Sequence, residues 1–334
     1  MENYMRWYGF NMLWMFIYRG DEAPEPDEKQ LDFIAGKGFN YIRLPMDYRY
    51  WTKDFDYFNP DEKVFVNVDK YIKACQQRGL HVSINLHRAP GYCINMNSIE
   101  KHNLWKDKEA QDAFAFIWEY IANRYKDVSS DALSFDLLNE PPNIGQYGFT
   151  RKRHEKVMRR TINAVRDVDL NRLLIINGIG GGGIAIPELA DTGTVHSGRG
   201  YMPFTVSHYR AGWVQVEKDY VWQPPEYPGL SDGKKWDKST LREYYSPWRE
   251  VEDKGTNVYI GEFGCFNKTP NDVALRWLSD LLSLYREYKW GYALWNFEGD
   301  FGIVEHGRPG AKYEKLDGFN VDREFLDLLI ENRV

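Results

Sequence analysis

The segment at residues 132–142 reads ALSFDLLNEPP, and the rest of the chain repeats its pattern. Residues 132–138 form a short, mainly apolar run, which predicts a buried strand. Pro141 and Pro142 end that strand because proline has no main-chain N–H to donate to a neighbouring strand. The amphipathic stretch at 150–168 then predicts a helix. A buried strand, a turn and a helix together are the repeating unit of α/β folds.

The same unit recurs along the whole chain. Eight apolar runs predict strands, at 8–13, 40–44, 80–86, 132–138, 173–177, 194–201, 257–260 and 291–294. Amphipathic stretches predict helices at 27–36, 68–78, 109–125, 150–168, 239–253, 271–288 and 323–331, with a weaker helical pattern near 184–190. This alternation predicts a (β/α)8 TIM barrel, and a doubly wound open sheet is the alternative. Because no linker interrupts the chain, we expect one domain over residues 1–334.

Aromatic residues are frequent: the 334 residues include 12 Trp, 23 Tyr and 18 Phe, or 16% of the chain. The mean hydropathy of -0.61 is nevertheless that of a polar protein, so we expect many of these rings to be partly exposed. Tyr and Trp combine an apolar face with a polar tip, which suits ligands that alternate apolar and hydroxylated faces, such as sugars. The net charge of -6, without a long basic run, argues against nucleic acid as a partner.

The sequence also argues against several other classes of protein. No run approaches twenty consecutive apolar residues, so we expect no membrane partner. The chain starts without the apolar core of a signal peptide, which predicts a cytoplasmic location, although a secreted chain whose leader had been removed would read the same. Cys75, Cys93 and Cys265 are scattered and are expected to be buried free thiols. No metal-ligand spacing is present, so we expect no metal site. As a separate expectation, the protein is a monomer.

Polar residues stand at the ends of several predicted strands, where a barrel carries its active site. Arg43 and His87 lie at the ends of the second and third strands, Asn139 and Glu140 follow the fourth, and Glu262 follows the seventh. Glycoside hydrolysis needs two carboxylates, one to donate a proton and one to attack the sugar or activate water. The alternative for an isolated glutamate is a solvated charge at the rim of the barrel.

Two motifs identify a family. Asn139-Glu140-Pro141, with Gly261-Glu262-Phe263-Gly264 further on, resembles glycoside hydrolase family 5, the cellulase family. Further similar segments lie, in the family's order and spacing, at 9–11, 42–45, 86–91, 293–296 and 301–303. The resemblance implies a (β/α)8 barrel that hydrolyses β-linked oligosaccharides or polysaccharides with retention of configuration and without a cofactor.

The resemblance also implies roles for individual residues. Glu140 would be the general acid/base, Glu262 the nucleophile, and Asn139 a hydrogen-bond partner of the sugar 2-hydroxyl. Arg43 would lie beneath the nucleophile and keep Glu262 ionised, because a nearby positive charge lowers the pKa of a carboxyl. His87 would have a supporting role.

The sixth strand departs from the family pattern. Tyr201, Pro203 and His208 match it, but Arg199 stands where the family has a histidine. An arginine near Glu140 would lower the pKa of the proton donor, unless its side chain points elsewhere or pairs with another acid such as Glu298. The alternative is that a bulge in the strand brings His196 into the histidine's place.

The aromatic residues near strand ends have two interpretations. Trp295 would be the platform on which the sugar stacks, or else a core residue that closes the barrel. Other rings near strand ends either line sugar subsites or pack beneath loops: Trp51, Trp105, Tyr147, Trp213, Trp222 and Trp236.

Residues 178–183 read GIGGGG and satisfy G-x-G-x-x-G, the dinucleotide-binding fingerprint. The following helical pattern is weak and contains Pro187, and the acidic residue expected about 20 residues later is absent, with Arg199 and Gly200 in its place. We therefore interpret this segment as a loop between a strand and a helix.

The expected activity is that of an endo-β-1,4-glucanase acting on β-glucan or cello-oligosaccharides. The alternatives within the family are a β-mannanase, another β-glycanase or an exo-glucosidase. An alternative of another class is a carbohydrate-binding protein on a degenerate hydrolase scaffold, suggested by Arg199. The presence of both Glu140 and Glu262 argues against that alternative.

Overall fold

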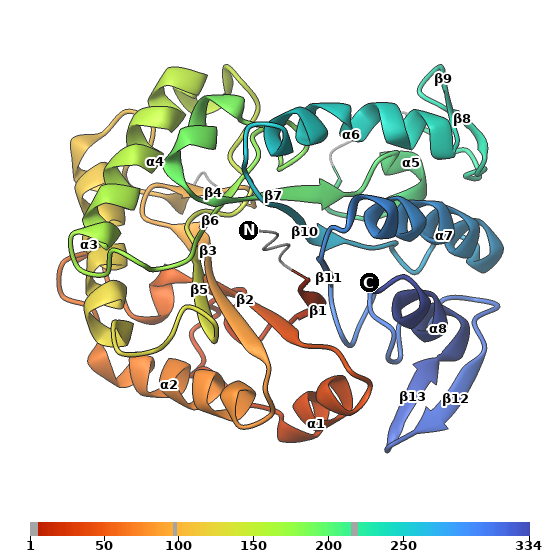
Figure 1. The fold of residues 1–334 in the computed structure, drawn as a ribbon, viewed down its shortest axis with the longest axis horizontal. Coiled ribbons are helices and arrows are strands. Elements are labelled where there is room, and N and C mark those ends of the chain that lie inside the picture. Colours follow the sequence, from red (N-terminus) through yellow and green to blue (C-terminus); the bar gives the residue numbers. More distant parts are fainter. Residues whose placement is uncertain (1–5, 96–98, 215–219) are drawn as a thin grey trace. The chain divides into compact units, whose positions relative to one another are not determined.

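The computed structural model describes residues 6–95, 99–214 and 220–334 (Figure 1). Contacts divide the chain into two compact units. Unit 1 comprises Met1–Asn11, Arg199–Arg249 and Tyr259–Val334, and unit 2 comprises Met12–Gly198 and Glu250–Val258.

Unit 2 is built from parallel strands that alternate with helices (Figure 1). Its strands are β2 (Tyr41–Asp47), β3 (His81–Ala89), β5 (Leu133–Asp136), β6 (Leu174–Asn177) and β7 (Val195–Gly200), the last of which runs into unit 1. They pair in parallel in the order β2, β3, β5, β6, β7. Every residue of these strands is buried, including the polar side chains of β3 (HVSINLHRA) and β7 (VHSGRG).

The helices of unit 2 are α1 (Glu28–Gly36), α2 (Glu62–Gln76), α3 (Lys108–Tyr125) and α4 (Arg151–Arg166). Asp27, Asp61 and Thr150 cap three of them by accepting main-chain N–H groups of the first turn. The cap at Asp61 makes α2 begin at Glu62, earlier than the predicted start at residue 68.

Shorter elements connect the main ones of unit 2: η1 (Tyr48–Tyr50), β4 (Tyr92–Cys93), η3 (Gln146–Gly148) and η4 (Pro187–Thr192). The weak helical pattern near 184–190 corresponds to η4, a 3-10 helix with Pro187 in its first turn, and therefore does not mark an α-helix.

Unit 1 contains the remaining parallel strands, β1 (Tyr8–Asn11), β10 (Val258–Phe263) and β11 (Tyr292–Leu294). β11 pairs in parallel with both β1 and β10. The helices of unit 1 are α5 (Phe204–Ser207), α6 (Lys238–Glu252), α7 (Asn271–Tyr288) and α8 (Arg323–Glu331). Each of the eight predicted strands therefore has a counterpart in the described part of the chain.

Two antiparallel hairpins in unit 1 were not predicted. They are β8 (Gly229–Ser231) with β9 (Lys234–Trp236), and β12 (Tyr313–Leu316) with β13 (Phe319–Asp322). The residues between the paired strands are Asp232-Gly233 and Asp317-Gly318, and all four have positive φ angles. Asp-Gly is a strong sequence signal for a two-residue hairpin turn, so this pattern was available in the sequence.

Three further observations concern the cysteines, membrane-spanning helices and metal sites. Cys75, Cys93 and Cys265 are buried free thiols. Among the described residues, no helix combines the length and the apolar character needed to cross a membrane. Within the same residues, no cluster of three or more His, Cys, Asp or Glu side chains could hold a metal ion.

Candidate active site

The predicted site residues of unit 2 lie on β2 and β3 and directly after β5. Arg43 is on β2 and His87 on β3, while Asn139 and Glu140 follow the end of β5. The main-chain N–H of Asn139 donates to the carbonyl of Leu86, 3.0 Å away, which holds this segment against β3. Glu140 is half-buried and has a left-handed backbone, with φ of 45°.

A buried polar network lies beside Asn139. Arg43 Nε pairs with Asp136 Oδ2 at 2.7 Å, and both side chains have no exposed surface. Arg43 Nη2 donates to Asn139 Oδ1 at 2.9 Å, and Asn177 Nδ2 donates to Asp136 Oδ1 at 2.7 Å. Asn85 Nδ2 also donates to the carbonyl of Asp136, at 3.1 Å. A buried ion pair needs such additional hydrogen bonds to offset the loss of hydration, and here they orient Asn139.

Sequence reasoning missed Asp136 and Asn177. The signal for Asp136 was present, because a charged residue inside an apolar strand needs a buried partner. Asn177 ends a predicted strand in the same way as the residues that were singled out.

His87 is buried, and its ring packs edge-on against Phe16, with ring centres 4.4 Å apart. The next residue, Arg88, pairs with Glu100 and lies 3.5 Å from Asp47. Glu100 Oε2 also accepts from Tyr48 Oη at 2.8 Å and from the main-chain N–H of Gly91 at 3.2 Å. These bonds connect Glu100 to the end of β3 and to the turn between β3 and β4.

The predicted site residues of unit 1 gather around Glu262, a buried residue of β10. Arg199 Nη2, at the end of β7, lies 3.2 Å from Glu262 Oε1, and the side chains are 2% and 4% exposed. Tyr201 Oη donates to Glu262 Oε2 at 3.2 Å. The residue that departs from the family pattern therefore pairs with the expected nucleophile, and an ion pair of this kind is made by an ionised carboxylate.

His208 and Trp295 belong to an aromatic cluster next to Tyr201. The His208 ring centre lies 4.9 Å from that of Tyr201 and 5.5 Å from that of Phe301. Burial lowers the pKa of His208 to about 4, so the ring is neutral near pH 7, and its Nδ1 lies 2.8 Å from Ser207 Oγ. Trp295 follows β11 and is partly buried against the cluster that contains Tyr201 and Phe301.

The other aromatic residues fall into two groups. Trp51, Trp105 and Trp236 are buried, which agrees with the packing interpretation and not with sugar subsites. Tyr147 and Trp213 are 44% and 56% exposed, and Trp222 is half-buried against Tyr220. Exposed rings of this kind remain candidates for sugar contacts.

The GIGGGG segment has the geometry of a tight loop. Ile179 and Ile184 form a two-residue bridge that closes it, and the next element is η4. A dinucleotide site needs the N-terminus of an α-helix directly after the glycines, so this segment lacks that part of the fingerprint.

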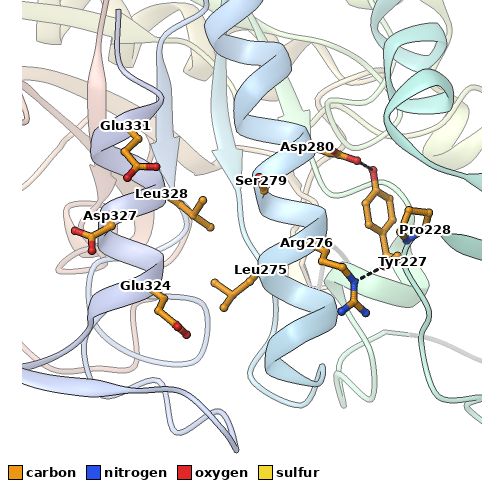
Figure 2. Close-up of a pocket in the computed structure, with 10 residues that line it drawn as sticks. All are labelled: Tyr227, Pro228, Leu275, Arg276, Ser279, Asp280, Glu324, Asp327, Leu328 and Glu331. Carbon is orange, nitrogen blue, oxygen red and sulfur yellow. Dashed lines mark hydrogen bonds between the residues drawn. The ribbon is translucent and has the colours of Figure 1, made fainter.

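Figure 2 shows a groove in unit 1 between α7 and α8, with a volume of about 670 Å³. Leu275 and Leu328 are among the residues that line it. Asp280 accepts from Tyr227 Oη at 2.9 Å, and Arg276 Nε donates to the carbonyl of Tyr227 at 2.8 Å. None of the predicted site residues lines this groove.

Parallel strands that alternate with helices, and that end in two glutamates with polar partners, define the class of (β/α)8-barrel glycoside hydrolases. A family model described as Cellulase (glycosyl hydrolase family 5) matches residues 2–300. The chain belongs to the cellulase family, glycosyl hydrolase family 5. The predicted barrel fold and the predicted glycoside hydrolase activity are confirmed.

Individual relatives agree with this assignment. Endoglucanase C of Acetivibrio thermocellus is 28% identical, and the match covers 87% of this chain and 89% of that protein. The crystal structure of a glycoside hydrolase is similar at a TM-score of 0.97 and 60% identity, and the match covers 99% of this chain and 100% of that one. The endoglucanase Cel5A of Thermotoga maritima has a TM-score of 0.77 at 24% identity, over 97% of this chain and 96% of that one, a similarity that concerns the fold alone.

Proposed function

We propose that this glycoside hydrolase is an endo-β-1,4-glucanase that acts on β-glucan or cello-oligosaccharides with retention of configuration. Family membership and the similarity to endoglucanase C of Acetivibrio thermocellus support this proposal. The observation that carries it is the setting of Glu262: a buried carboxylate beside a guanidinium, with one oxygen held by a tyrosine hydroxyl. This setting suits an ionised nucleophile.

In the proposed reaction, Glu262 attacks C1 of the sugar while Glu140 donates its proton to the glycosidic oxygen. The bond between C1 and that oxygen breaks, the leaving sugar departs with a hydroxyl group, and a glycosyl-enzyme ester remains. Glu140, now a carboxylate, takes a proton from water, whose oxygen attacks C1 and releases Glu262. Two inversions at C1 leave its configuration unchanged.

The remaining residues have proposed binding roles. Because Arg43 donates to Asn139 Oδ1, the amide nitrogen of Asn139 is oriented as a hydrogen-bond donor for the sugar 2-hydroxyl. Tyr201 and Arg199 hold the nucleophile's two oxygens. Trp295 is the proposed stacking platform, and His87 and His208 are proposed to contact the sugar.

The test uses an aryl β-cellobioside, followed by carboxymethylcellulose, lichenan, glucomannan and cello-oligosaccharides. We expect wild-type turnover on glucans, β-configured first products by NMR, and a loss of at least about 10³-fold in kcat for Glu262→Ala. Preferred cleavage of mannan would instead assign a β-mannanase, and release of single glucose units an exo-glucosidase. A wild type that binds cello-oligosaccharides without turnover would contradict the proposal.

A further inference from the structure

Glu140 has a backbone conformation that glutamate rarely adopts. Its φ of 45° lies in the left-handed region, where the Cβ atom of an L-residue crowds the carbonyl oxygen. Such a residue persists only where the surrounding structure holds it, and these conformations are concentrated at functional sites. The chain must therefore contain groups that hold Glu140 in place.

Residues 140–142 have four main-chain polar groups, because the two prolines lack N–H groups. All four are hydrogen-bonded within unit 2. The N–H of Glu140 donates to Asn177 Oδ1 at 3.2 Å, and its carbonyl accepts from Tyr92 Oη at 2.6 Å. The carbonyls of Pro141 and Pro142 accept from the N–H groups of Gly181 and Gly180, at 3.0 and 3.1 Å. We call Tyr92, Asn177, Gly180 and Gly181 the clamp.

The backbone angles of the loop at 178–183 explain why this loop is rich in glycine. Gly180, Gly181 and Gly182 have φ angles of 64°, 68° and 78°, which only glycine adopts without strain. A Cβ atom on Gly180 would lie 2.9 Å from Ile184 Cδ1 and 3.1 Å from Asn143 Oδ1. The loop therefore presents two adjacent N–H groups to the carbonyls that follow Glu140.

The two side chains of the clamp are themselves held in place. Tyr92 is fully buried on β4, which pairs with β3, and burial raises the pKa of its hydroxyl, so the hydroxyl stays protonated and donates. Asn177 Nδ2 donates to Asp136 Oδ1, which orients the opposite amide oxygen toward Glu140.

We propose that the clamp is a positioning device for the general acid/base, and that Tyr92, Asn177, Gly180 and Gly181 are its positioning residues. This inference rests on the proposed role of Glu140. Proton transfer requires the carboxyl to lie within hydrogen-bond reach of the glycosidic oxygen, and the left-handed φ sets the direction in which the side chain leaves the backbone. Relaxation of this φ turns the carboxyl away from that position, although the barrel stays folded.

The first test is Tyr92→Phe, which removes one hydroxyl from the clamp. We measure kcat/KM for phenyl and 2,4-dinitrophenyl β-cellobiosides, because only the poorer phenol leaving group needs a proton from the acid. We expect kcat/KM for the phenyl substrate to fall at least about tenfold more than for the dinitrophenyl substrate. The matched control is Tyr292→Phe, since Tyr292 is also fully buried and also donates to a main-chain carbonyl, that of Leu329.

The second test is Gly181→Ala, with Gly79→Ala as its control. Both glycines have φ of 68°, and a Cβ atom on either meets no atom within 4 Å, so the two substitutions carry the same backbone strain. We expect similar losses in Tm for both variants, but a change in the ratio of the two kcat/KM values for Gly181→Ala alone. The Tm values therefore report the backbone strain that both variants have, and the ratio of kcat/KM values reports the displacement of Glu140 that we expect only in Gly181→Ala.

Glu140→Ala distinguishes failure of the clamp from failure of the proposed function. If this variant loses activity mainly on the phenyl substrate and Tyr92→Phe and Gly181→Ala do not, the clamp is overturned while the role of Glu140 stands. If Glu140→Ala loses activity equally on both substrates, the proposed role of Glu140 is overturned, and the inference with it. The proposed role of the clamp would also be overturned if the ratio of kcat/KM for the phenyl substrate to kcat/KM for the dinitrophenyl substrate were the same in Tyr92→Phe and Tyr292→Phe.

Discussion

At the scale of single residues, Arg199 shows how a substitution within a family pattern is accommodated. Its guanidinium lies 3.2 Å from Glu262 Oε1, so the positive charge meets an acid that has to be ionised. Guanidinium stays protonated throughout the range of ordinary enzyme assays, whereas a histidine would titrate within it. We therefore expect Arg199 to make the charge beside Glu262 independent of pH.

Arg199→His tests this expectation. With 2,4-dinitrophenyl β-cellobioside, which needs no proton donor, kcat/KM of the variant should fall as the pH rises above the histidine pKa, whose ordinary value is about 6.5. The sign follows because only the protonated imidazole pairs with a carboxylate, so the pair is present at low pH and lost as the pH rises. Wild type should show no such fall between pH 6 and about 8. Parallel pH profiles for the two proteins would refute this role of Arg199.

At the scale of secondary-structure elements, Asp136 connects four strands of unit 2. It ends β5, pairs with Arg43 of β2, accepts from Asn177 of β6, and its carbonyl accepts from Asn85 of β3. The sequence showed Asp136 inside an apolar run but did not show its partners, because Arg43 is 93 positions away.

We expect Asp136→Asn to lower the free energy of unfolding by about 3–5 kcal/mol, because it removes the buried carboxylate that pairs with the Arg43 guanidinium. Urea unfolding followed by circular dichroism measures the change. Lys108→Ala is the control, since it removes an exposed ion pair with Asp112 and should cost less than about 0.5 kcal/mol. A loss below about 1 kcal/mol in Asp136→Asn would show that the pair is not needed for stability.

The hairpin β12–β13 provides a second prediction at this scale. Gly318 has φ of 94° in the hairpin turn, whereas Gly36 ends α1 without a positive φ, and a Cβ atom on either meets nothing within 4 Å. We expect Gly318→Ala to destabilise the protein by about 1–2 kcal/mol. Gly36→Ala should stabilise it by about 0.5 kcal/mol, since alanine loses less entropy on folding. Thermal unfolding distinguishes the two, and equal shifts in Tm would contradict the assigned turn.

At the scale of the whole molecule, four buried histidines affect the response to acid. Burial is the largest cause in each case: it lowers the pKa of His154 to about 3, and of His81, His196 and His208 to about 4. Each is neutral when folded and binds a proton on unfolding below about pH 6.5. The unfolded chain therefore binds more protons than the native one in this range, and stability falls as the pH falls.

Each of these histidines should contribute up to about 1.4 kcal/mol of lost stability per pH unit between about pH 6 and pH 4. Scanning calorimetry from pH 7 to pH 4.5 should accordingly show a steep fall in Tm. His154→Phe should make the fall shallower, because in the described structure neither ring nitrogen of His154 has a hydrogen-bond partner and its neighbours include Trp105 and Phe149. A fall as steep as that of wild type would exclude His154 as a contributor.

The amino-acid sequence alone predicted the order of the barrel strands and main helices, the barrel class and the family, and it singled out Glu140 and Glu262 as candidate catalytic residues. These features are local, because buried parallel strands read as apolar runs and Glu140 and Glu262 lie inside short motifs. Asp232-Gly233 and Asp317-Gly318 are also local sequence signals, and they would have predicted the two hairpins.

The folded chain alone determined which distant groups meet. The pairing of Arg199 with Glu262, the network around Asp136 and the clamp on Glu140 each join residues that are far apart in sequence. The burial of Trp51 and Trp105 and the exposure of Trp213 likewise depend on neighbours that no local pattern names. The physical reason is that periodicity reports which face of an element is apolar, whereas ion pairs, hydrogen bonds and backbone strain depend on the packing of elements against one another.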